Sequence, residues 1–144
     1  MGKCEVGKEM ILQNKLWTPD NSFLLEYRAR IECGEILVGQ DLWLELENLK
    51  EDFHNDEYYY DTEDALLRMD FMENCVRLTK SPFYNKPMVL MLWQKAFIEA
   101  IYSFKMTKTQ RDRFKKILLL IARKNTKSET CSALGLSELT VGPE

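Results

Sequence analysis

Apolar residues recur at helical spacing through most of this chain. They repeat every three or four positions over residues 23–33, 41–54, 62–79 and 89–104. Such spacing places apolar side chains on one face of a helix, where a neighbouring element can cover them. We therefore predict four helices, and we expect the last of them (VLMLWQKAFIEAIYSF) to be strongly buried because it is apolar nearly all round.

The expected helix ends carry residues that suit them. Asn21 or Ser22 can accept a hydrogen bond from the first turn of the first helix, and Asp61 can do the same for the third. Gly34 is suited to the left-handed conformation that often ends a helix. The segment SPFYNKP contains two prolines, which should break the third helix and form a turn before the fourth.

Near the carboxyl end the pattern changes. Residues 114–122 (FKKILLLIA) form the only convincing strand, and a basic polar turn and a pattern that could begin a helix follow. We therefore predict a mainly α chain that leads into the first strand-loop-helix unit of an α/β fold. One parallel strand cannot form a sheet, so we expect the rest of that sheet to lie beyond residue 144.

The turn resembles a phosphate-binding P-loop, which is usually written G-x-x-x-x-G-K-[ST]. Lys127 and Ser128 stand in the last two positions, where Lys contacts the β and γ phosphates and Ser binds Mg²⁺. Ile121 and Thr126 stand where the two glycines are expected. A β-branched residue in the second glycine position costs about 1–2 kcal/mol if the backbone must be left-handed, so we expect weakened phosphate binding.

Charge is unevenly distributed around a net value of −3. Acidic residues dominate residues 41–73, whereas basic residues dominate residues 105–127. The basic block could contact the phosphates of a nucleotide or a nucleic acid. It could equally be a solvated surface that compensates the acidic half, and the sequence leaves both alternatives open.

Composition argues against several classes of protein. The four cysteines are far apart, and the single histidine, His54, has no cysteine near it, so a zinc site is not expected. No apolar run approaches the roughly 20 residues of a membrane-spanning helix, and the first residues lack the apolar core of a signal peptide. We therefore expect a cytoplasmic protein.

Several motifs occur in an order that resembles a known family. The stretches EYRARIECGEILVGQ, YYYDTEDALLRMDFMENCVRLTKSPFYNKP, LWQK and LLLIARKNTKS follow one another over roughly residues 20–144. They are similar to the amino-terminal part of the large terminase subunits of tailed bacteriophages, in which a WQK helix precedes a loop such as ARKNGKS. The resemblance implies a flexible arm (1–22), a helical region (23–112) and the incomplete start of a P-loop ATPase core (113–144).

The resemblance also implies roles for individual residues. Gln94 would contact adenine, with Trp93 beside it, and Arg123 would stabilise charge on the transferred phosphoryl group as the catalytic arginine. Ser128 would also bind Mg²⁺. Plain core packing of Trp93 and an ordinary surface role for Gln94 stay open. The implied nucleotide-binding residues are Trp93, Gln94, Lys124, Asn125, Thr126, Lys127 and Ser128.

A terminase large subunit is the ATP-driven motor that packages double-stranded DNA into the procapsid, and in many members it also carries a nuclease. The implied cofactors are ATP and Mg²⁺. The implied partners are double-stranded phage DNA, the portal and the small terminase subunit, in a homo-oligomeric ring within the bacterial host cytoplasm. We expect the Walker B acid and the nuclease to be missing from these 144 residues, so that the chain alone does not turn over ATP. The alternative is a helical protein-interaction module without nucleotide chemistry.

Overall fold

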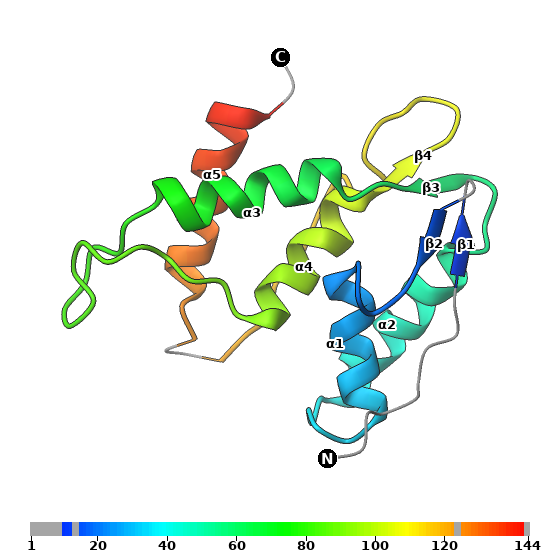
Figure 1. Ribbon diagram of the computed structural model, residues 1–144, viewed down its shortest axis with the longest axis horizontal. Coiled ribbons are helices and arrows are strands. Elements are labelled where there is room, and N and C mark those ends of the chain that lie inside the picture. The colour runs from blue at the N-terminus through cyan, green and yellow to red at the C-terminus, as the bar shows by residue number, and fades with distance from the viewer. Residues whose placement is uncertain (1–9, 13–14, 123–124, 143–144) are drawn as a thin grey trace.

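The chain is mainly helical, as predicted (Figure 1). The computed structural model describes residues 10–12, 15–122 and 125–142, and describes side chains from Trp17 onward. None of the helices in this part of the chain is both long and apolar enough to cross a membrane. The helices are α1 (Phe23–Glu32), α2 (Gln40–Asp52), α3 (Glu63–Cys75), α4 (Leu92–Ser103) and α5 (Lys127–Val141).

Short strands make two small antiparallel pairs. The strand β1 (Met10–Leu12) pairs with β2 (Lys15–Trp17), and β3 (Tyr58–Tyr60) pairs with β4 (Phe104–Met106). The arm predicted over residues 1–22 therefore contains a hairpin, which the sequence pattern did not indicate. Only 2% of the Trp17 side chain is exposed, so the described part of this arm is anchored in the core. Residues 1–9 and 13–14 lie outside the described part.

The helix ends follow the sequence prediction in part. The Ser22 side chain accepts a hydrogen bond from the Leu25 N–H at 3.3 Å, and Gly34 has a φ of 76°, as expected for a helix end. At the start of α3, Thr62 takes the cap position, while the Asp61 carboxylate accepts from the Glu63 N–H at 3.1 Å. Both predicted first-turn interactions therefore have a counterpart in the structure.

The third predicted helix is too long. It was expected to continue to residue 79, but α3 ends at Cys75. The next residues are extended because they pair with residues 85–88 across the turn that contains Pro82. The Met88 N–H donates to the Val76 carbonyl at 3.1 Å. The fourth predicted helix also starts late, at Leu92, and gives way to strand β4 at Phe104.

The helix α4 lies at the centre of the molecule, with α1 on one side and α3 on the other (Figure 1). Ala96 joins one buried cluster that includes Trp17, Phe53 and Phe104. Ile98, which is fully buried, joins a second cluster that contains Met72 and Ala133. Because α4 contributes to both clusters, it holds α1 and α2 on one side to α3 and α5 on the other.

The predicted strand at 114–122 is the main correction. These residues form no strand in the structure. Backbone groups of a strand need a neighbouring strand to hydrogen-bond with, and the described part of the chain provides none beside this segment. The loop that follows nevertheless leads into a helix, α5, which begins at Lys127 as the sequence indicated.

Candidate nucleotide site

The WQK sequence lies at the amino-terminal end of α4. Met91 caps this helix, and its N–H donates to the Gln94 side-chain oxygen at 2.8 Å. This bond satisfies one of the N–H groups that a helix start otherwise leaves without a partner. Only 1% of Gln94 is exposed, so its amide belongs to the interior, which excludes the surface role that the sequence left open.

The other end of the Gln94 amide contacts α5. The side-chain nitrogen Nε2 donates to Thr130 Oγ1 at 2.7 Å and to Thr126 Oγ1 at 3.2 Å. Gln94 and Thr126, two of the predicted site residues that are far apart in sequence, therefore lie together. Both N–H groups of this amide donate within the protein, so donation from Gln94 to a ligand requires one of these bonds to be exchanged.

Thr126 takes the conformation that favours glycine. It has φ 53° and ψ 19°, which is the left-handed region, directly before the first residue of α5. A non-glycine residue there costs roughly 1 kcal/mol or more because its Cβ crowds the backbone. The expectation that Thr126 replaces a glycine at a cost in strain is therefore matched by the backbone of this loop.

The next residues are exposed at the start of α5. Asn125, Thr126, Lys127 and Ser128 are all solvent-exposed. The first N–H groups of a helix have no acceptor within it, and the helix dipole favours an anion beside them. Lys127 and Ser128 are thus placed where a phosphate could be bound. Arg123 and Lys124, two further predicted site residues, lie outside the described residues.

A carboxylate lies in the same turn of α5. The pKa of Glu129 is held below its usual value, first because its side chain accepts a hydrogen bond from its own backbone N–H and also because Lys80 lies beside it. The Lys80 Nζ is 3.2 Å from the Glu129 carboxylate. This acid takes one of the helix-start N–H groups and would repel a nearby phosphate, so it adds to the effect of Thr126 in weakening such a site.

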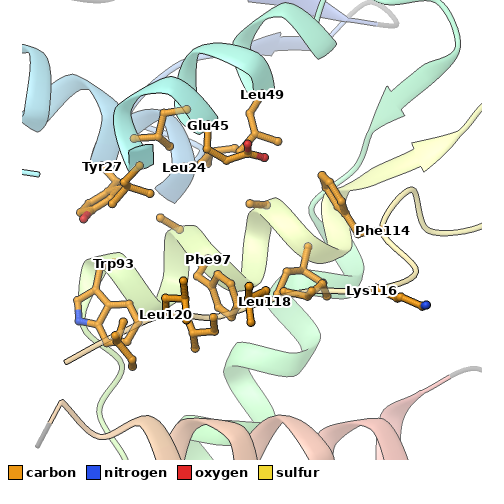
Figure 2. Close-up of a pocket in the computed structure, with 18 residues that line it drawn as sticks. Leu24, Tyr27, Glu45, Leu49, Trp93, Phe97, Phe114, Lys116, Leu118 and Leu120 are labelled. Atoms are coloured by element: carbon orange, nitrogen blue, oxygen red, sulfur yellow. The ribbon is translucent and has the colours of Figure 1, made fainter. Parts of the chain in front are cut away.

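Trp93 lines an apolar groove of about 560 Å³. Figure 2 shows Trp93 and Phe97 of α4 beside Leu118 and Leu120 of the extended segment. Leu24 and other side chains from α1 and α2 line the groove as well. A flat aromatic ligand would suit this lining. Although Trp93 and Gln94 are neighbours in sequence, Trp93 lines the groove whereas Gln94 contacts the loop.

The helix α5 is fixed to the rest of the fold through Arg68. Only 1% of Arg68 is exposed, and its guanidinium lies 3.2 Å from the Glu138 carboxylate of α5. It also stacks on the Tyr102 ring, 4.2 Å from the centroid, while Tyr102 donates to the same carboxylate. Burial and the Glu138 carboxylate raise the pKa of Tyr102 to about 12, so the hydroxyl remains a donor. This network attaches the carboxyl-terminal half of α5 to α3 and α4.

Sequence reasoning missed two residues of this site. Thr130 and Glu129 gave no signal because their roles depend on Gln94 and Lys80, which are distant in the chain. For the metal, Ser128 is the only predicted ligand, and the described residues contain no group of three His, Cys, Asp or Glu side chains placed to hold an ion. If Mg²⁺ binds here, Ser128 and the phosphates of the nucleotide would have to supply ligands, with water completing the shell.

Comparisons with protein-family models, with curated proteins and with solved structures found no match to this chain.

Proposed function

We propose that this chain is the amino-terminal portion of a tailed-bacteriophage terminase large subunit, the motor that packages double-stranded DNA. The proposal starts from the ordered motifs around WQK and ARKNTKS. The single structural observation that supports it is the pair of hydrogen bonds from Gln94 to Thr126 and Thr130. They bring the two motifs, which are separated by more than thirty residues in sequence, into contact.

In this function the two parts of the site divide the nucleotide between them. The base would lie in the apolar groove against Trp93, and Lys127 would contact the phosphates. Ser128 would hold Mg²⁺, and Arg123 would approach the transferred phosphoryl group. Gln94 would link the base-binding end of α4 to the phosphate-binding loop through its hydrogen bond to Thr126. The expected partners are double-stranded DNA, the portal and the small terminase subunit in the host cytoplasm, with the motor assembled as a homo-oligomeric ring.

Nucleotide binding can be tested on this chain directly. We expect titration with millimolar MgATP to shift the NMR amide signals of residues 125–128 and the indole signal of Trp93, because both places contact the ligand. Affinity should be weak, given the strain at Thr126 and the acid at Glu129. We expect no ATP turnover by these residues alone, since hydrolysis also needs an acid for Mg²⁺ and a group that orients water.

A charge-matched comparison makes this test specific. Lys127→Ala should abolish the shifts, whereas Lys108→Ala, at an exposed lysine in the connection after β4, should leave them unchanged. Absence of any shift at the loop in the unmodified chain would contradict the nucleotide site. Equal loss in both variants would show a general charge effect instead.

One observation favours the alternative, a helical interaction module. Leu118 and Leu120, two positions apart on the extended segment, are 80% and 82% exposed, and neighbouring exposed apolar side chains are typical of protein-binding surfaces. If the chain does not bind MgATP, these exposed side chains favour a protein-binding role. The MgATP titration therefore separates the two functions.

A further inference from the structure

Residues 76–88 fold as a hairpin that projects from the body of the molecule beyond α3 and α4 (Figure 1). Its two sides are joined by backbone hydrogen bonds, including Leu78 N–H to the Lys86 carbonyl at 2.9 Å. At the tip, the Phe83 N–H donates to the Lys80 carbonyl at 3.0 Å. The base of the hairpin is anchored by Met88, which is buried in the second core cluster.

The tip exposes two aromatic side chains. The exposed fractions are 55% for Phe83 and 73% for Tyr84. Neither side chain belongs to the core clusters, so folding of the described residues gives no reason for aromatic residues here. The Lys86 Nζ lies 5.6 Å from the Phe83 ring centroid, which places a positive charge next to an aromatic face. Aromatic faces beside cations are the elements that proteins use to stack nucleic-acid bases.

The charged residues within and just after the hairpin are all basic in sequence. No acidic residue occurs in the sequence between Glu73 and Glu99, whereas this stretch contains four basic residues. Two of these are neutralised by partners outside the hairpin, since Lys95 contacts Glu73 and Lys80 contacts Glu129. The other two, Arg77 and Lys86, have no carboxylate within 4.0 Å in the described part of the chain.

We propose that this hairpin binds single-stranded nucleic acid. Bases stack on Phe83 and Tyr84, and Arg77 and Lys86 contact the backbone phosphates. A duplex offers the same phosphates but keeps its base faces stacked on one another, so it cannot use the aromatic tip. The site rests on the hairpin alone and does not depend on nucleotide binding at α5.

The test uses a fluorescein-labelled single-stranded oligothymidine, read by fluorescence anisotropy against the complete chain. We expect binding at low salt, and weaker binding of a duplex of equal length. The double variant Phe83→Ser, Tyr84→Ser should bind the single strand about tenfold more weakly or worse, because stacking of each base contributes substantially to such affinity. The matched control is Leu37→Ser, Leu44→Ser, which removes two exposed apolar side chains from the region of α1 and α2.

The phosphate contacts have their own readout. Arg77→Gln with Lys86→Gln should weaken binding and reduce the slope of log affinity against log salt concentration by about 1 to 2, since each phosphate contact to a single strand contributes about 0.7. Lys108→Gln with Lys115→Gln removes two exposed charges elsewhere and should leave the slope unchanged.

Stacking can also be observed without any substitution. Base stacking should move the ring-proton NMR signals of Phe83 and Tyr84 upfield in the unmodified chain, so the result does not depend on the variants folding. The proposal would be overturned if the chain did not bind the single strand. It would also be overturned if a duplex bound equally strongly and the aromatic substitutions did not change that binding. Equal loss in the hairpin variants and their controls would overturn it as well.

Discussion

Two stretches of this chain have similar apolar content but differ in how far they are buried. The helix α4 is buried at half of its positions and joins both core clusters. The segment 114–122 is rich in leucine and isoleucine, yet Leu118 and Leu120 are 80% and 82% exposed. A helix satisfies its own backbone hydrogen bonds and can therefore be buried from all sides, whereas an extended segment needs a partner strand before it can be covered. Backbone pairing, more than apolar content, separates the two.

The largest expected contrast is between matched truncations. Ile98→Ala removes a fully buried side chain of α4 and should lower the free energy of unfolding by about 3 kcal/mol, because it leaves a cavity. Leu118→Ala should change it by less than about 0.5 kcal/mol, because that side chain is already in water. Urea unfolding measures both. A cost above 1 kcal/mol for Leu118→Ala would show that the segment is packed in solution and would break the comparison.

A smaller effect is expected at the buried acid of α4. Glu99 accepts hydrogen bonds from Ser22 and Tyr60 and from the Phe23 N–H, the last at 2.8 Å. Glu99→Gln should cost about 2 kcal/mol because its amide NH₂ group must face these donors. Glu99→Asp, which keeps the charge but shortens the reach, is the companion variant for unfolding measurements.

The pH dependence of this cost has a defined sign. Burial raises the pKa of Glu99, so the folded state holds this proton to higher pH than the unfolded state does. The stabilisation that comes from the protonated carboxyl is complete below the unfolded pKa and is lost as pH rises through the folded pKa. The stability difference between the unmodified chain and Glu99→Gln should therefore shrink as pH rises from about 4. A difference that grows with pH would contradict the raised pKa.

The smallest effect concerns the loop that follows the extended segment. Thr126→Gly should be about 1 kcal/mol more stable than Thr126→Ala, because both lose the hydroxyl that accepts from Gln94 and only glycine relieves the positive φ. In the MgATP titration the glycine variant should also bind more tightly than the original. Equal stability of the two variants, measured by thermal unfolding, would mean that the left-handed conformation is not retained in solution.

Local pattern allowed much of the helical part to be predicted. The periodicity of apolar residues located α1 to α4 within a few positions, and the chemistry of Ser22 and Gly34 located both ends of α1. Lys127 was expected at the start of a helix after a basic turn, and α5 begins there. These predictions succeeded because capping and helix periodicity depend on residues only a few positions apart.

The sequence by itself determined that the chain is mainly helical, that its central helix is apolar nearly all round, and that Lys127 and Ser128 follow a basic turn. Tertiary structure decided that Trp93 faces a groove while Gln94 bonds Thr130, and that residues 76–79 join a hairpin. It also decided that residues 114–122 form no strand. The physical reason is the same in each case: helices make their hydrogen bonds locally, whereas strands, hairpins and buried amides depend on partners that are distant in the chain.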